Sequence, residues 1–234
     1  MNISTKDRAA LRDLAKRTLE LSDSPRNRAL YREWLLHGRD HASARPMIRV
    51  EIETFEREVL PPLMRCEGDE ARRIERRMLR PIANFTLFED DTLVPDCYPV
   101  FDRLFFIPFG IEVRRRETGG LGHHFIPVLH ELEEDWHLLG PSVYGADAEG
   151  AEKEAQDAAE LLGDILPVKR VSNCAYCCPT QDIVHIMNMD DLYVAMIDEE
   201  ARFHALMRRL TDDYIAYFDL LAREKRLRSA ARAQ

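Results

Sequence analysis

No stretch of the sequence approaches the roughly 18 consecutive apolar residues that a membrane-spanning helix needs. The N-terminus, MNISTKDRAALRDLAKR, lacks the apolar core of a secretion signal, and internal repeats and low-complexity linkers are also absent. Cysteines number only five, an odd count in a chain of 234 residues, which does not suggest a disulfide framework. We therefore expect a cytoplasmic globular protein whose thiols are reduced.

Positive charge is also in deficit. The chain has 33 Lys and Arg residues against 42 Asp and Glu residues, a formal net charge of −9. Such a surface repels phosphate backbones and anionic lipid. The two basic runs, at 70–80 and 222–234, alternate with acids or lie at the chain end, as is typical of solvated helix faces. We therefore expect neither nucleic acid nor a membrane among the partners.

Two helices are predicted before the first strand pattern. The first runs from about Lys6 to Leu21, with Ser4 and Asp7 spaced as a capping pair. The second begins at Ser24-Pro25 and stops at Gly38. We interpret residues 1–45 as an N-terminal helical extension.

Strand and helix patterns then alternate. Strands are predicted from the alternation of apolar and charged residues in 46–53, and from the apolar runs within 91–100 and 164–171. The segments 104–113 and 123–129 are compatible with strand or loop. Helices are predicted at 69–85, 131–140, 147–162, 179–187 and 190–196, and a long amphipathic helix begins at Asp198. This order predicts an α/β fold with parallel pairing, although about three good strands are too few for a closed barrel of eight.

The order of segments resembles the uroporphyrinogen decarboxylase superfamily, which includes cobalamin- and corrinoid-dependent methyltransferases. The likeness covers about residues 40–220. It is carried by RPMIRVEI, DDTLVPDCYPV, PFGIEV, HHFIPVLHELEEDWHLLGPSV, LLGDILPVKR and DIVHIMNMDDLYVAMIDEEARFHALMRRLTDDYIAYF. The last string is the most diagnostic, because it is similar to the family's short helix, turn and long helix ending in an aromatic residue. Glu199-Glu200 stands where the family usually has Pro-Glu.

The resemblance implies that residues 46–234 are the first half of a (β/α)₈ barrel, a partial barrel that follows the helical extension. It also implies a small methylated substrate or a corrinoid protein as partner, with corrinoid (cobalamin) and zinc as cofactors of the complete architecture. Two departures narrow the function. EIETFEREVLPP lacks the arginine motif with which true decarboxylases grip their substrate, which disfavours porphyrinogen decarboxylation. The His-x-Cys pair that binds zinc in the methyltransferases does not occur in this chain.

The segment SNCAYCCPTQDIVH gathers three cysteines near a histidine. Cys174, Cys177 and Cys178, with His185 as a fourth ligand, have spacing compatible with a tetrahedral metal site. Pro179 places Cys177 and Cys178 at a helix N-terminus, where a redox thiol would be activated. No second CxxC supports either interpretation. The third alternative is that these small residues, Cys177 among them, only line a substrate pocket at a strand end.

Carboxylates and histidines supply the remaining candidates. Asp96 and Glu51 end predicted strands, where a carboxylate can bind substrate or position a proton, or merely cap a loop. His123 and His124 follow a glycine-rich approach and are candidates for a general acid, a general base or a ligand. Adjacent residues in an extended segment point to opposite sides, so at most one of the two faces a given pocket. Their alternative is an exposed or packing role.

Three functions remain open. The first is a methyltransferase-like barrel protein, with Asp96, His123 and His124 as catalytic candidates and Glu51 and Cys177 as substrate-binding candidates. The second is a non-catalytic half-barrel remnant that self-associates, because an unclosed parallel sheet exposes a pairing edge. The third is a cysteine-rich metal-binding or redox module.

Overall fold

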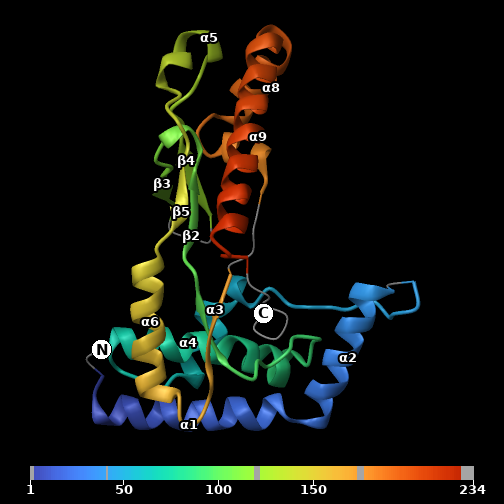
Figure 1. Ribbon diagram of the computed structural model, residues 1–234, viewed down its shortest axis with the longest axis vertical. Coiled ribbons are helices and arrows are strands. Elements are labelled where there is room, and N and C mark those ends of the chain that lie inside the picture. Colours follow the sequence, from blue (N-terminus) through green and yellow to red (C-terminus); the bar gives the residue numbers. More distant parts are fainter. Residues whose placement is uncertain (1–2, 41, 119–121, 173–176, 228–234) are drawn as a thin grey trace. The chain divides into compact units, whose positions relative to one another are not determined.

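Figure 1 shows the chain as a computed structural model that describes residues 3–40, 42–118, 122–172 and 177–227. These residues form two compact units whose chain segments alternate. Within the described part, unit 1 is made of the residues up to Phe101 and of Ala148–Val171, and unit 2 of Asp102–Asp147 and of the residues from Ser172 onward. No helix of these residues is long and apolar enough to cross a membrane.

The two N-terminal helices begin as the sequence predicts. Helix α1 (Thr5–Ser22) is capped by the Oγ of Ser4, which accepts a hydrogen bond from the N–H of Asp7 at 3.0 Å. Helix α2 (Pro25–Arg39) has proline in its first turn, and the Oγ of Ser24 accepts from the N–H of Asn27 at 3.2 Å. The other helical elements of unit 1 are η1 (Ile52–Thr54), α3 (Glu56–Val59), η2 (Pro61–Leu63), α4 (Asp69–Ala83), the π-helical turn η3 (Asn84–Phe88) and α6 (Ala148–Leu162).

A short parallel sheet completes unit 1. Strand β1 (Tyr98–Phe101) pairs with β6 (Val168–Val171) in the register Tyr98 to Val168, and α6 leads directly into β6. Helices α1, α4 and α6 pack with this pair around a core. Its large side chains that are at most 1% exposed are Leu11, Ile74, Tyr98, Val100, Leu161, Leu162 and Leu166. The helices predicted at 69–85 and 147–162 and the strand predicted within 164–171 are thereby confirmed.

Unit 2 contains two antiparallel strand pairs. Strand β2 (Leu104–Ile107) pairs with β5 (Val143–Ala146), and β3 (Arg114–Glu117) pairs with β4 (His123–Ile126). The strand alternative is therefore confirmed for parts of 104–113 and 123–129. The helical elements of this unit are η4 (Pro108–Gly110), α5 (Leu132–Asp135), η5 (Trp136–Leu138), α7 (Pro179–Val184), α8 (Met189–Asp198) and α9 (Glu200–Arg223).

The core of unit 2 forms along α9, the long helix predicted to be amphipathic, whose apolar face is largely buried. Phe106 of β2 stacks on Tyr214 of α9 with ring centroids 4.0 Å apart, and Tyr144 of β5 contacts Tyr217 with centroids 5.5 Å apart. The aromatic contacts join the long helix to the β2–β5 pair. The buried α9 residues are Leu206, Leu210, Tyr214, Tyr217 and Leu221.

The first predicted strand, 46–53, is wrong. Residues 46–51 have no strand partner in the described part of the chain, and residues 52–54 form η1. The alternation of Ile48 and Val50 with charged residues suggested one buried face, yet Ile48 is 66% exposed. Side chains replace the missing strand, since the N–H groups of Ile48 and Val50 donate to carboxylates of Asp91 and Asp90, both at 2.7 Å.

The chain has an α/β fold with small sheets. Among the described strands one pair is parallel and two pairs are antiparallel. A (β/α)₈ barrel uses parallel strands throughout, so the pairing seen in unit 2 is not barrel pairing.

Candidate functional site

In unit 1, side chains of helix α2 form hydrogen bonds with the backbone of the segment 90–96. The side-chain amide of Asn27 pairs with the backbone of Val94 in both directions. The N–H of Val94 donates to the Asn27 Oδ1 at 2.9 Å, and the Asn27 Nδ2 donates to the Val94 carbonyl at 3.0 Å. Asn27 is buried, so these bonds satisfy backbone groups that water cannot reach. The arrangement fixes Leu93, Val94 and Asp96 beside the helix.

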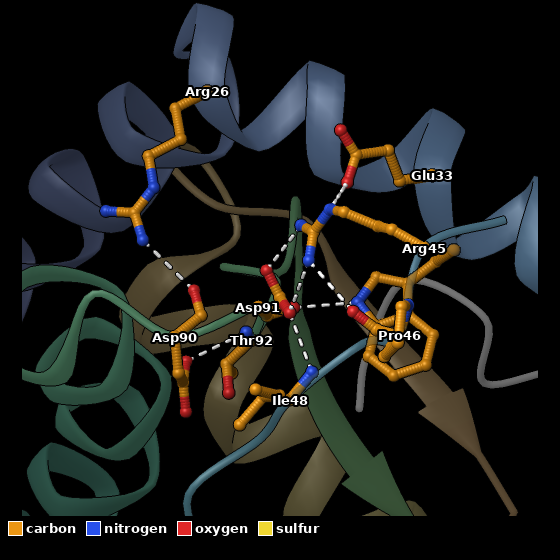
Figure 2. A network of polar contacts seen from close by, with 9 residues as sticks. Arg26, Glu33, Arg45, Pro46, Ile48, Asp90, Asp91 and Thr92 are labelled. Carbon is orange, nitrogen blue, oxygen red and sulfur yellow. Dashed lines mark hydrogen bonds and ion pairs between the residues drawn. The ribbon is translucent and has the colours of Figure 1, made fainter.

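A second set of contacts ties the same segment to the chain that follows α2 (Figure 2). Arg45 binds Asp91 with two hydrogen bonds, from Nη2 to Oδ1 at 2.6 Å and from Nη1 to Oδ2 at 3.0 Å. The Nε of Arg45 donates to Glu33 of α2 at 2.5 Å, and Arg26 donates to the carbonyl of Asp90 at 3.0 Å. The guanidinium of Arg45 lowers the pKa of the Asp91 carboxyl below its usual range.

Asp90 is held from the other side by Asn84 in η3. The Asn84 Nδ2 donates to the Oδ2 of Asp90 at 2.6 Å and to the carbonyl of Val50 at 2.8 Å. Asp90 also accepts from the N–H of Thr92 at 2.9 Å. Asn84, Asp90 and Thr92 are buried, so this network gives the segment 90–96 a fixed course.

A cavity of about 440 Å³ opens between α2 and this segment. Its walls are partly apolar, and its charged groups come from both sides. Arg28 pairs with Asp23 at 2.7 Å, and Asp96 pairs with Lys169 of β6 at 3.0 Å. Among the described residues no carboxylate lies within ion-pair distance of Arg32. The lining residues are Leu19, Ser22, Asp23, Asn27, Arg28, Tyr31, Arg32, Leu93, Val94 and Asp96.

One predicted site residue, Asp96, therefore lines a cavity, and the other catalytic candidates lie elsewhere. Glu51 is exposed, stands just before η1 and is not part of the cavity lining. His123 and His124 belong to β4 of unit 2, where His124 is exposed and pairs in register with Arg116. The sequence interpretation grouped Asp96 with these histidines, but they belong to different units.

The cysteine segment lies in unit 2, and Cys174 falls outside the described residues. Cys178 precedes α7, and its Sγ lies 3.8 Å from the Oγ1 of Thr180. His185 follows α7, and its ring contacts that of Phe125 at a centroid distance of 4.1 Å. No group of three or more His, Cys, Asp or Glu residues in the described part could hold a metal ion. Cys177 is exposed, but desolvation by neighbouring atoms, with Asp182 nearby, raises the pKa of its thiol, which is unfavourable for a redox thiolate.

The buried Tyr214 and the half-buried Asp182 form a polar pair next to these cysteines that the sequence interpretation did not single out. The hydroxyl of Tyr214 donates to the Oδ2 of Asp182 at 2.6 Å. Burial raises the pKa of the Asp182 carboxyl even though this hydrogen bond acts in the opposite direction. Burial also raises the pKa of Tyr214. The pair is placed by the α9 stripe and by α7, and it contributes to the packing of unit 2.

The cavity residues of α2 were missed by sequence interpretation, although a signal was present. Asn27, Arg28, Tyr31 and Arg32 stand at positions i, i+1, i+4 and i+5, which places them on one face of a helix. That face contains polar and charged residues beside an aromatic one, while Leu30 is buried. A helix face of this composition is compatible with either solvent or a ligand, so the spacing alone did not indicate a cavity.

Comparisons with models of known protein families, with curated proteins and with solved structures find no match to this chain.

Proposed function

We propose that the chain is related to the corrinoid-dependent methyltransferases of the uroporphyrinogen decarboxylase superfamily, and that unit 1 binds a small methylated substrate in the α2 cavity. The observation that carries the proposal is the position of Asp96, which lines this cavity beside Lys169. The volume, about 440 Å³, falls in the range of sites for small organic ligands. Asp96 is also a catalytic candidate from the sequence, whereas the carboxylate expected to bind substrate is Glu51.

The charges of the cavity indicate an anionic substrate with an apolar body. Asp23 and Asp96 are each paired with a cation, and Arg32 is left without a carboxylate among the described residues. A guanidinium binds a carboxylate or phosphate through two parallel hydrogen bonds. Leu19, Tyr31, Leu93 and Val94 offer apolar contacts to the rest of the ligand. We therefore propose a small methylated carboxylate, bound by Arg32 through its anionic group.

The role of Asp96 follows from its neighbour. The Nζ of Lys169 lies 3.0 Å from its Oδ1, so the carboxylate has a fixed position at the cavity wall. There it can accept a hydrogen bond from the substrate or take up a proton at a carboxylate oxygen.

The cofactors of the family do not fit the residues described. Zinc needs a group of three or four His, Cys, Asp or Glu ligands, and the described residues offer none. A corrinoid is a macrocycle larger than the ligands that a cavity of this size holds. No chemical step is therefore assigned to either group.

The finer fold proposal is limited to unit 1. Strand β1 pairs in parallel with β6, and α6 leads into β6, while residues 102–147 of unit 2 lie between β1 and α6 in the chain. A strand, a helix and a parallel strand are the repeating unit of a (β/α)₈ barrel. This arrangement supports the proposal that unit 1 contains part of such a barrel.

Binding of 4-methoxybenzoate tests the substrate proposal. We expect saturation-transfer NMR to show contact between the purified full chain and 4-methoxybenzoate, and weaker contact with methoxybenzene, which lacks the carboxylate. Arg32→Gln should weaken binding about tenfold, because it removes the charged hydrogen-bond donor. Arg39→Gln is the matched control, since Arg39 is an exposed arginine of α2 outside the cavity lining. Equal binding of both ligands, or equal effects of both substitutions, would contradict the proposal.

A further inference from the structure

Helix α8 of unit 2 exposes an unusual number of large apolar side chains. Only Leu192 and Ala195 of this helix are buried. Five apolar residues on its remaining surface are between 46% and 80% exposed: Met189, Tyr193, Val194, Met196 and Ile197. Contiguous exposed apolar surface of this kind marks an interaction site more often than chance exposure does.

Three of these exposed side chains, Met189, Tyr193 and Met196, line a groove between α7, α8 and α9. The groove has a volume of about 410 Å³, and Ile183, Met189, Tyr193, Met196, Phe203 and Met207 are among the residues that line it. Three of these six are methionines, whose flexible side chains adapt to apolar partners. A groove with two helical walls and an apolar floor can take the apolar face of a third helix.

None of the described residues that line the groove is charged, so the charges at the ends of α8 indicate which occupant it fits. The charged residues of α8 are all acidic, namely Asp190, Asp191 and Asp198, and Glu200 begins α9. His130 lies 3.2 Å from Asp191, His204 lies 3.8 Å from Glu200, and Arg208 is exposed next to Met207. Glu199 is engaged by the N–H groups of Leu132 and Glu133. Carboxylates therefore predominate at both ends of α8.

This charge pattern disfavours a second copy of the chain as the occupant. Two α8 helices packed antiparallel would bring Asp190 and Asp191 of one copy close to Asp198 of the other, and like charges repel at such distances. A partner helix with basic residues would instead complement the carboxylates at both ends of α8.

We propose that the groove between α7, α8 and α9 binds an amphipathic helix of a partner protein. The partner helix carries apolar residues at i, i+3 or i+4 and i+7, and Lys or Arg beside them. Its apolar face fills the groove, and its basic residues approach Asp190, Asp191 and Asp198. This site is independent of the α2 cavity, which lies in unit 1.

The methionines provide a direct readout of the site. The probe is a peptide of about 18 residues made of Leu and Lys in an amphipathic helical pattern. With methionine methyl groups labelled by ¹³C, the full chain should show shifts of Met189, Met196 and Met207 as this peptide is added. Met64 and Met78 of unit 1 serve as internal references and should stay in place.

Two matched peptides separate the contributions of charge and apolar surface. A Leu and Glu peptide of the same pattern should bind at least about tenfold more weakly, because it meets the acidic ends of α8. A Ser and Lys peptide of equal charge should not shift the groove methionines, because it lacks the apolar face. Equal binding of the Leu/Lys and Leu/Glu peptides would overturn the charge assignment. Shifts of Met64 and Met78 as large as those in the groove would overturn the site itself.

Substitutions on the exposed surface complete the test. The double substitution Met196→Gln and Tyr193→Gln should weaken binding of the Leu/Lys peptide at least about tenfold. The control Leu36→Gln changes an exposed apolar residue of α2 and should leave binding of this peptide unchanged. Circular dichroism checks that each variant folds. If the chain sediments as a dimer that the double substitution dissociates, the occupant is a second copy and the proposed partner is wrong.

Discussion

Arg45 binds both carboxylate oxygens of Asp91, one from each terminal nitrogen of its guanidinium. The same carboxylate accepts the N–H of Ile48 at 2.7 Å, so Asp91 joins two chain segments through charge and through the backbone. Arg45 is the last residue of the predicted helical extension, and Asp91 belongs to the segment 90–96 that α2 contacts. This pair therefore fixes the path of residues 46–51, which have no strand partner in the described part of the chain.

Asp91→Asn should lower the free energy of unfolding of unit 1 by about 1–3 kcal/mol at neutral pH, because it removes charged hydrogen bonds at a buried side chain. Since Arg45 lowers the pKa of Asp91, the stabilisation is present above the unfolded pKa and is lost as the pH falls through the lower folded value. Urea titrations of wild type and variant should therefore converge below about pH 4.

Glu33→Gln is the control for that experiment. Glu33 also contacts Arg45, but both side chains of this pair are more than 40% exposed. An exposed ion pair contributes about 0–1 kcal/mol. Two results would show that the charge of Asp91 is not the cause of the lost stability. One is a Glu33→Gln variant as destabilised as Asp91→Asn, and the other is a stability difference between wild type and Asp91→Asn that does not change with pH.

Asn27→Ala should destabilise unit 1 by about 1–3 kcal/mol, because it leaves the buried N–H and carbonyl of Val94 without partners. Asn27→Asp should not restore stability, since a carboxylate cannot donate to the carbonyls of Val94 and Ser22. Thermal unfolding followed by circular dichroism measures both effects.

The matched substitution is Asn188→Ala in unit 2. Asn188 is exposed, and its Nδ2 lies 3.4 Å from Asp191. Its loss should change stability by less than about 0.5 kcal/mol. A stable Asn27→Asp variant would show that the bond to the Val94 carbonyl contributes little.

Asp182→Asn should stabilise unit 2 at neutral pH. Burial raises the pKa of Asp182, so the ionised carboxylate is less stable in the folded state than in the unfolded state. The contribution of Asp182 is most favourable below its unfolded pKa and is lost as the pH rises through the folded value. Asparagine keeps an oxygen that accepts the hydroxyl of Tyr214.

Melting temperatures at pH 7 and near pH 4 check this prediction. The advantage of Asp182→Asn should be largest at pH 7 and should shrink toward pH 4. Asp212→Asn, at an exposed position of α9, should change the melting temperature little at either pH. A lower melting temperature of Asp182→Asn at pH 7 would mean that the charge, rather than the hydrogen bond, stabilises the pair with Tyr214.

Helices were predictable from the sequence because their signals are local. Ser4 and Ser24 each cap a helix by accepting the N–H of the residue three positions ahead, and the spacing alone predicts that contact. The apolar stripe of α9 likewise predicts the face that packs in unit 2. Such signals depend on residues within a few turns, so the remaining chain cannot easily change them.

Strands were less predictable, because pairing depends on distant residues. The alternation around Ile48 and Val50 is typical of a strand, but Asp90 and Asp91 bind their N–H groups instead. The strands β2 and β5 pair antiparallel although the alternation of elements suggested parallel pairing. Nothing in either short segment specifies the direction of its partner.

Of the residues proposed as candidates from the sequence, Asp96 lies at the α2 cavity. Asp96 was chosen because it ends an apolar run, and it does line a cavity. The cavity itself depends on how Asn27 holds Val94 across 67 positions of the chain, a contact that no local pattern contains. Arg32 is a candidate for binding an anionic ligand because it has no carboxylate partner among the described residues, which its sequence position does not reveal.

The interleaved course of the chain has a consequence for biosynthesis. The parallel partner of β1 is β6, and the residues between them include a large part of unit 2. During vectorial translation, β1 leaves the ribosome well before β6 does. Until β6 has been synthesised, β1 therefore remains without its parallel partner beside the N-terminal helices. Contacts between residues far apart in the sequence also form slowly. We expect nascent chains that end before Val168 to depend on a chaperone, which full-length chains would no longer need.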